Sequence, residues 1–308
     1  MFIYIIRRLF QTIPVMFGVT LAVFMMMHLI PGDAAQIMAG EQANPEQVEA
    51  MREKLGLNDP LYVQYFSYIG NAIQGDLGTS IRTNRDVTSE IFTSRFWITV
   101  ELAIWGTILS VILGLIAGIV SATRKYTFAD TSLMIVALFG ISMPNFWLGI
   151  MLIYFFSVNL GVLPVAGWGN DWKQMILPVI TLGTGGAAII ARMTRSSMLD
   201  VIDQDYIRTA YAKGVSDKLV IYKHALRNAL IPVVTVVGLQ FGGLLGGAVI
   251  TETVFAINGL GRLIINSITM RDFPMVQGTI LVCTLLFVFV NFLVDITYRL
   301  INKRIDLN

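Results

Sequence analysis

The chain has 308 residues, of which 55% are apolar and 14% charged, and its formal net charge is +2. Soluble domains carry about a quarter charged residues, so this composition excludes an ordinary soluble protein and indicates one that lies in a membrane. The small net charge also argues against nucleic acid as a partner.

Long apolar runs follow one another along the chain. A bilayer core is about 30 Å thick and a helix rises about 1.5 Å per residue, so roughly 17–25 apolar residues can cross it. Backbone groups in lipid must be bonded within their own segment, which makes each span a helix. The predicted spans are residues 9–30, 97–121, 132–157, 175–191, 229–250 and 276–298. The expected fold is all-α: one polytopic membrane domain over residues 1–308 with six transmembrane helices.

The distribution of basic residues orients these spans. Cytoplasmic loops carry the excess of Lys and Arg, which makes both termini and the 192–228 loop cytoplasmic and the acid-rich 31–96 segment extracytoplasmic. The basic residues that give this orientation outside the loop are Arg7, Arg8, Arg124, Lys125, Arg299, Lys303 and Arg304.

The 31–96 segment is predicted to hold two short helices. In "NPEQVEAMREKLGL", Asn44 can cap a helix, Pro45 suits its first position and Gly56 can close it. The following stretch, "PLYVQYFSYIGNAIQGDLG", predicts an amphipathic helix that could rest on the membrane surface. Its expected apolar face consists of Leu61, Tyr65, Tyr68, Ile69 and Ala72.

The sequence carries no signature of catalysis or of an energy source. There is no phosphate-binding loop and no H-E-x-x-H motif, and the two histidines, His28 and His224, fall on opposite sides of the membrane. We therefore expect no enzymatic activity, no catalytic or metal site and no cofactor on this chain.

Two features inside the spans are candidates for a transport pathway. Glu101, about one turn inside the second span, is either an interfacial carboxylate or a cavity lining. On the fifth span Gly238, Gly242 and Gly246 leave one stripe without side chains, and Gln240 adds a polar group. This stripe predicts close helix packing within the chain, or a smooth wall along a substrate path or subunit interface. Glu252, just beyond it, is expected to be solvated.

The stretch from Asp205 to Pro232 predicts two short helices joined by a glycine. Asp205 and Arg208 are spaced for an i, i+3 pair, Gly214 ends the first helix, and Pro232 suits the first turn of the next span. The second helix, from Ser216 to about Asn228, is expected to carry an apolar stripe of Leu219, Tyr222, Leu226 and Leu230, with Lys218, Lys223 and Arg227 away from it.

Two interpretations of this stretch remain open. A basic amphipathic loop could lie on anionic lipid. Because its charges are mixed and its two helices are compact, a shaped docking surface for a partner that supplies energy is the favoured interpretation.

At these residues the sequence resembles a known family. "RTAYAKG", Arg208 to Gly214, resembles the E-A-A-x-x-x-G loop of permease subunits of ABC importers, with Arg208 and Thr209 where the general family has Glu and Ala. The longer stretch around it is similar to the dipeptide/oligopeptide/nickel permease branch. Further matching motifs are "HLIPGD", "GDLGTS", "SMPNFWLG", "RMTRSSMLDVI" and "GLGRLIINSITMRDFPMVQG".

The resemblance implies a type I ABC importer permease fold in a bacterial or archaeal cytoplasmic membrane. It implies a second homologous permease, an extracytoplasmic substrate-binding protein, and two ATP-binding subunits that hold ATP and Mg. The residues expected to couple to those subunits are Asp205, Tyr206, Arg208, Thr209, Ala210, Lys213, Gly214, Lys218, His224, Arg227, Asn228 and Pro232.

The substrate and the transport class have alternatives. "MAGE", "ITET" and "GLQ" favour dipeptides or oligopeptides, whereas the short 158–174 loop and the chain length also suit glutathione permeases. Nickel is disfavoured because no cluster of metal-ligating side chains lines the spans. Outside this family, the chain could be a self-sufficient ion-coupled carrier or channel in which Glu101 couples the ion, or a membrane scaffold that transports nothing.

Overall fold

The structure is a computed structural model that describes residues 2–29, 34–39, 43–54 and 56–301. Within these residues all regular structure is helical, apart from an isolated bridge between Thr79 and Asp86. Lys303 and Arg304, two of the orienting residues, and part of the motif "HLIPGD" lie outside the described residues. The chain divides into two compact units, residues 1–98 with 258–286 and residues 99–257 with 287–308.

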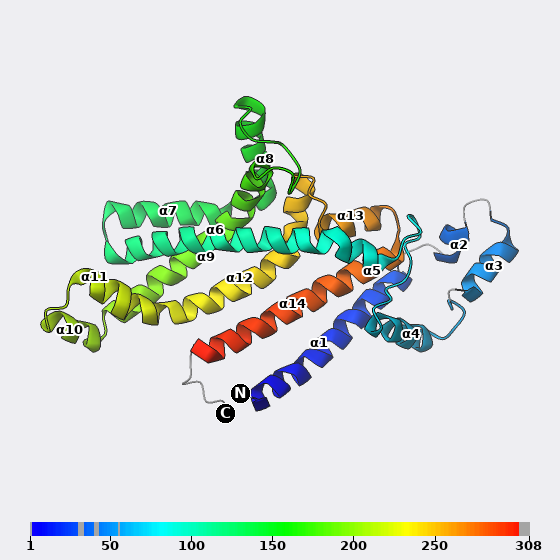
Figure 1. Cartoon of the computed structure of the whole chain (residues 1–308), viewed down its shortest axis with the longest axis horizontal. Helices are drawn as coiled ribbons and strands as arrows, with labels where there is room; N and C mark the ends of the chain where they lie inside the picture. The colour runs from blue at the N-terminus through cyan, green and yellow to red at the C-terminus, as the bar shows by residue number, and fades with distance from the viewer. Residues whose placement is uncertain (1, 30–33, 40–42, 55, 302–308) are drawn as a thin grey trace. The chain divides into compact units, whose positions relative to one another are not determined.

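The first unit carries the N-terminal helix and the short helices of the 31–96 segment (Figure 1). A hydrophobic cluster of Val87, Ile91, Leu260, Leu263, Met275 and Val282 joins its later elements. Its elements are α1 (Phe2–Leu29), α2 (Ala34–Ala39), α3 (Pro45–Lys54), α4 (Leu61–Ile73), α5 (Val87–Glu90), the π-helical turn η1 (Ile91–Arg95), α13 (Leu260–Thr269) and the first half of α14 (Phe273–Ile301).

The predicted cap of α3 is present. The Gln47 N–H donates to Asn44 Oδ1 at 2.8 Å, and the Asn44 N–H donates to Gln47 Oε1 at 3.0 Å. This reciprocal pair satisfies two backbone donors at the helix start. Gly56 follows the helix at φ +65°, in the left-handed region that closes helices.

Helix α4 packs on α1 through part of the apolar face that was expected to rest on the membrane surface. Tyr68, Ile69 and Ala72 of that face are partly buried, whereas Leu61 is exposed. Tyr65 is buried, its hydroxyl lies 2.8 Å from Thr20 Oγ1, and its ring makes edge contacts with Phe17 and Phe24. All five residues of this face were expected to rest on the membrane surface. The large exposed side chains of α4 are Leu61, which belongs to the expected face, and Tyr62, Val63, Phe66 and Ile73, which do not.

The second unit is built around one long helix, α9 (Lys173–Ile202), which contacts α7, α8 and α12 (Figure 1). The predicted span 175–191 lies inside α9, which continues eleven residues past it to Ile202. The other elements are α6 (Phe96–Thr123), α7 (Phe128–Ser142), α8 (Asn145–Leu152), η2 (Ile153–Asn159), α10 (Asp205–Ala212), α11 (Asp217–Leu219), η3 (Val220–Ala225), α12 (Leu226–Val254) and the second half of α14.

Small residues bring α6 and α9 into close contact. A Cβ added at Gly114 would lie 2.6 Å from the Ile190 side chain, and one at Gly118 would lie 2.5 Å from Thr194. The Ser110 hydroxyl donates to the Gly183 carbonyl at 2.7 Å, so a polar contact crosses the same interface. Small residues at helix crossings allow backbones to approach in this way.

The predicted span 132–157 is not one continuous helix in the structure. It consists of α7 and the α8–η2 stretch, which meet at an angle of 103°. Pro144 lacks a backbone N–H and disfavours the helical conformation of Met143 before it, which is extended at φ −78°, ψ 125°. Pro144 therefore begins a new helix rather than continuing the old one.

The described residues contain fewer clear spans than the six expected. Four stretches are long and apolar enough to cross a membrane: Val87–Thr123, Lys173–Ile202, Asp217–Leu245 and Phe273–Thr297. The bent pair adds a fifth if both halves form one span, and the apolar part of α1, Phe10–Met25, is shorter. The count of six spans and the cytoplasmic termini stay predictions.

Candidate functional site

The first helix of the 205–232 segment ends at a glycine, as the sequence predicts. Gly214 has φ +75°, its N–H donates to the Tyr211 carbonyl at 2.9 Å, and the Val215 N–H donates to the Ala210 carbonyl at 3.2 Å. This is the two-bond motif in which a left-handed residue ends a helix. At the start of α10, Arg208 and Asp205 approach to 3.7 Å, both largely exposed.

The second predicted helix does not end before the membrane span. Helix α11, the π-helical turn η3 and α12 follow one another without a break, and Pro232 lies inside α12 rather than in its first turn. The predicted apolar stripe is also wrong, because Leu219 and Tyr222 are exposed while Val220, Ala225 and Ala229 are buried. The π turn adds a residue to one turn of helix, so a stripe counted at helical spacing loses its register there.

A small apolar cluster fixes the segment to the rest of its unit. Ile207 of α10 is fully buried with residues from the ends of three long helices and from η3. The buried members are Ala122, Met198, Ile207, Val220, Ala225 and Ala229. Asn228 Nδ2 donates to the Tyr206 hydroxyl at 2.8 Å and so ties α10 to the base of α12. These contacts join α10 to α6, α9 and α12.

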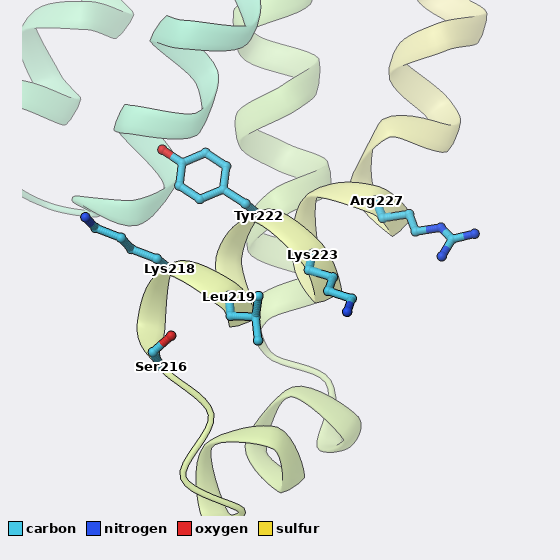
Figure 2. A pocket seen from close by; sticks show the side chains of 6 residues that line it. All are labelled: Ser216, Lys218, Leu219, Tyr222, Lys223 and Arg227. Atoms are coloured by element: carbon cyan, nitrogen blue, oxygen red, sulfur yellow. The ribbon is translucent and has the colours of Figure 1, made fainter.

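The opposite face of the segment is exposed and carries an open groove of about 520 Å³. Its lining residues come from α11, η3 and the start of α12: Ser216, Lys218, Leu219, Tyr222, Lys223 and Arg227 (Figure 2). Three cations beside an exposed leucine and tyrosine form a surface that suits a partner with both acidic and apolar groups.

Most of the predicted coupling residues are accessible, but they do not form one patch. Ala210, His224 and Pro232 are partly buried. The exposed residues are Asp205, Tyr206, Arg208, Thr209, Lys213, Gly214, Lys218, Arg227 and Asn228. Of the whole predicted set, only Lys218 and Arg227 line the groove.

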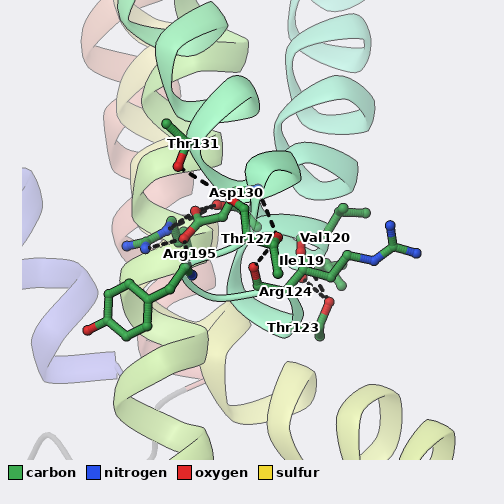
Figure 3. Close-up of polar contacts among 10 residues, drawn as sticks. Ile119, Val120, Thr123, Arg124, Thr127, Asp130, Thr131 and Arg195 are labelled. Carbon is green, nitrogen blue, oxygen red and sulfur yellow. Dashed lines mark hydrogen bonds and ion pairs between the residues drawn. The ribbon is translucent and has the colours of Figure 1, made fainter.

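Sequence reasoning missed a partly buried ion pair close to this segment. Arg195 of α9 donates from Nε to Asp130 Oδ1 and from Nη2 to Asp130 Oδ2, both at 2.8 Å (Figure 3). Ser121 of α6 also donates to Asp130 Oδ1, and the Tyr126 N–H donates to Oδ2 at 3.0 Å. The pair thus joins α6, α7 and α9 at the end that carries the 205–232 segment. Arg195 lies in the quoted motif "RMTRSSMLDVI", but its partner is 65 positions away.

Two carboxylates of the second unit, Glu101 and Glu252, have different environments. Glu101 is exposed and accepts a hydrogen bond from Trp168 Nε1 at 3.1 Å. Glu252, expected to be solvated, is fully buried, and the Thr99 hydroxyl donates to its Oε1 at 2.6 Å. That expectation was wrong because Thr99 lies 153 positions away, beyond any local pattern.

Part of the glycine stripe on α12 packs within the chain. A Cβ at Gly238 would lie 2.4 Å from Val294 of α14, and one at Gly242 would lie 3.3 Å from Asn291. Gln240 is partly buried, and the surroundings of Gly246 lie outside the described residues. Beside Gly238 is a cavity of about 400 Å³ between α6, α12 and α14. It is mainly aliphatic, with Thr107, Thr235 and Thr297 in its lining.

The part of the chain that the structure describes contains no group of three or more His, Cys, Asp or Glu side chains placed to hold a metal ion. The candidate site is the 205–232 segment, which is anchored by Ile207 and carries an exposed cationic groove. Its features are those of a contact surface for another protein.

The chain belongs to a family of membrane transport components. Residues 110–307 match the family described as binding-protein-dependent transport system inner membrane component, and residues 1–103 match the family of its N-terminal membrane part. The chain is thus a permease subunit of an ABC importer, a transport subunit rather than a catalytic one.

Curated relatives match over almost the whole chain. Glutathione transport system permease proteins GsiC from Escherichia coli, Shigella dysenteriae serotype 1 and Shigella flexneri serotype 5b are each 48% identical over 305 residues, 98% of both chains.

Solved structures of two transporters share the fold. An inward-facing MetNI methionine ABC transporter matches with a TM-score of 0.57 and 22% identity, covering 68% of this chain and 95% of that one. An amino acid ABC transporter with histidines matches with a TM-score of 0.54 and 16% identity, covering 68% and 92%. At these identities the likeness supports the fold alone.

Proposed function

We propose that this chain is the membrane-spanning permease subunit of an ATP-driven importer whose substrate is glutathione or a peptide of similar size. One observation supports the coupling part of the proposal. The 205–232 segment, hereafter the coupling segment, has one face buried against its own unit and another face exposed. Ile207 is buried while the groove residues Lys218, Tyr222 and Arg227 remain open to a partner.

The anchored segment suits the transmission of force. A partner ATPase subunit that closes on ATP would displace α10 and α11 as it moved. Because Ile207 packs with Ala122 and Met198, that displacement would reach α6 and α9 rather than bend a loose loop. The Asp130–Arg195 pair would carry it on to α7.

The partners and the topology follow from this role. A second permease would complete the pathway, two ATP-binding subunits would hold ATP and Mg, and an extracytoplasmic binding protein would deliver the substrate. This chain would itself bind no cofactor. We propose that α1, α6, the bent α7–α8 pair, α9, α12 and α14 form six spans in a bacterial or archaeal cytoplasmic membrane, with both termini in the cytoplasm.

Glutathione is the first candidate substrate because the full-length relatives are glutathione permeases. Dipeptides or oligopeptides are the second, favoured by the motifs "ITET" and "GLQ", and nickel is the least favoured. The 400 Å³ cavity is a poor candidate for the pathway, since its aliphatic lining would leave a charged peptide without partners. An ion-coupled carrier that uses Glu101 is the alternative of another class.

Reconstitution tests the proposal. The chain is coexpressed with the permease, ATPases and binding protein of its own operon, and uptake of labelled glutathione, dipeptides and longer peptides is measured in proteoliposomes. We expect ATP-dependent uptake of glutathione that requires the binding protein. Transport by the purified chain alone would contradict the importer proposal and favour an ion-coupled carrier. If the complete transporter took up dipeptides but not glutathione, the proposed substrate would be dipeptides.

A further inference from the structure

In the first unit, a tight turn at residues 80–85 is bound to the end of α13. The Ser80 N–H donates to the Arg85 carbonyl at 2.9 Å and closes the turn. Asp272, nearly buried, accepts from the Ser80 hydroxyl and from the Ile81 N–H, the latter at 3.1 Å. A carboxylate from the α13–α14 connection thus fixes the shape of a turn about 190 positions earlier in the chain.

Three exposed arginines lie on this turn and at the adjacent end of α13. Arg82 and Arg85 lie on the turn, and Arg271 lies just after α13. Arg82 Nε donates to the Met270 carbonyl at 2.8 Å, so the turn and the helix end are side by side. The nearby carboxylate of Asp86 accepts from the Ser89 N–H as a helix cap at 2.6 Å.

The backbone at Arg271 is unusual for its residue type. The Arg271 N–H donates to the Ile268 carbonyl at 3.1 Å and the Asp272 N–H donates to the Ser267 carbonyl at 2.8 Å, which ends α13 in the same way that Gly214 ends α10. Arg271 has φ +55°, a position that glycine fills most readily. Asn84, on the turn, is also left-handed at φ +53°. Asn adopts this conformation readily, so Arg271 is the strained residue, and a strained residue at an exposed place points to a function there.

The positive charge of these three arginines is opposite to the charge that the proposed topology predicts for the outer side. By the proposed topology, basic residues gather in the cytoplasm while the 31–96 segment lies outside. Three arginines on adjacent backbone at the proposed outer side therefore need a reason other than topology.

We propose that Arg82, Arg85 and Arg271 form a docking surface, the outer arginine cluster, for an acidic face of the extracytoplasmic binding protein. This inference rests on the proposed function. The three residues lie on a turn and a helix end whose backbones are fixed by Asp272, Ser80 and Met270. Planar guanidinium groups carried by a fixed backbone suit paired recognition of carboxylates on a shaped surface. Attraction to anionic lipid requires no such arrangement.

Arg271→Gly is the sharpest variant because it removes one charge and relaxes the backbone at the same time. It is combined with Arg82→Ala and Arg85→Ala in the complete transporter, reconstituted in nanodiscs of neutral phosphatidylcholine, and the Kd for the purified binding protein is measured over a range of salt concentrations. We expect binding about 10-fold weaker or more, mainly through slower association, and a reduced dependence on salt. Uptake at limiting binding protein should fall in parallel with the loss of binding.

Arg52→Ala is the matched control, since Arg52 is another arginine of the proposed outer segment and is paired with Glu49 on α3. An unchanged Kd and salt dependence in the triple variant, with ATP hydrolysis and uptake intact, would overturn the docking surface and leave the proposed function standing. An effect that appeared only with anionic lipid in the nanodisc would likewise overturn it. If the unmodified complex showed no uptake, that result would instead contradict the proposed function.

Discussion

Asp130 lies at the start of α7 with its side chain 6% exposed, and Arg195 holds it through two hydrogen bonds. Asp130→Asn keeps the shape but removes the charge, leaving a partly buried guanidinium with weaker partners. We expect a loss of about 1–3 kcal/mol in unfolding free energy. Thermal unfolding of the solubilised complex measures it, with Asp171→Asn, an exposed carboxylate, as the control.

The same pair can be separated from general destabilisation by a double-mutant cycle. Arg195→Gln should cost as much as Asp130→Asn, and the double variant should cost less than the sum of the two single changes. Additive effects would mean that the two side chains do not interact in the assembled protein. Arg195→Lys should rescue only in part, because an ammonium lacks the planar fork that meets both carboxylate oxygens.

Gly214 offers a second prediction at the residue scale. A Cβ there would meet nothing within 4 Å, so the only obstacle to a side chain is the backbone at φ +75°. Left-handed backbone costs most residues about 1–2 kcal/mol, and least for Asn. ATP-driven uptake should therefore fall in the order Gly, Asn, Ala, Val. Gly243→Ala, on regular helix with equally open space, should leave uptake unchanged; equal uptake across the Gly214 series would contradict the role of the bend.

At the scale of elements, the α6–α9 contact depends on glycines that leave no room for a methyl group. Gly114→Ala would put a Cβ 2.6 Å from Ile190 and 2.9 Å from the Ala187 carbonyl, so the helices must separate. Overpacking of this kind costs about 1–3 kcal/mol. A lower Tm of the complex is expected, whereas Gly18→Ala on α1, where nothing lies within 4 Å, should not lower it. An unchanged Tm for Gly114→Ala would show that the helices pack differently in the assembly.

Elements with local signals were predicted well, and those set by distant contacts were not. The cap at Asn44 and the break at Gly214 depend on residues within a few positions, which a sequence displays directly. Pro144 also carried a local signal for the 103° bend, but the long apolar run around it hid the break. The π turn η3 has no such signal, and the face of the helix after Ser216 was therefore predicted wrongly.

The same distinction between local signals and distant contacts applies to the candidate site. The position of the coupling segment could be predicted from its motif and its charges, because both are properties of a continuous stretch. Its anchor could not, since Ile207 is buried by Ala122 and Met198 only after the long helices have packed. Burial of Glu252 by Thr99 is set by that packing as well.

At the scale of the whole molecule, the coupling segment is proposed to work only within a larger assembly, and its cationic groove gives a direct test. Lys218→Glu, Lys223→Glu and Arg227→Glu reverse three exposed charges without touching the buried cluster, so the chain should still fold and enter the membrane. We expect the ATPase subunits no longer to copurify with it, because like charges facing each other across an interface cost several kcal/mol. Arg124→Glu with Lys125→Glu, exposed and predicted to lie on the same side of the membrane, is the matched control and should retain them. Retention of the ATPases by the triple variant would exclude the groove from the contact and leave the exposed side of α10, with Arg208 and Tyr211, as the surface to test next.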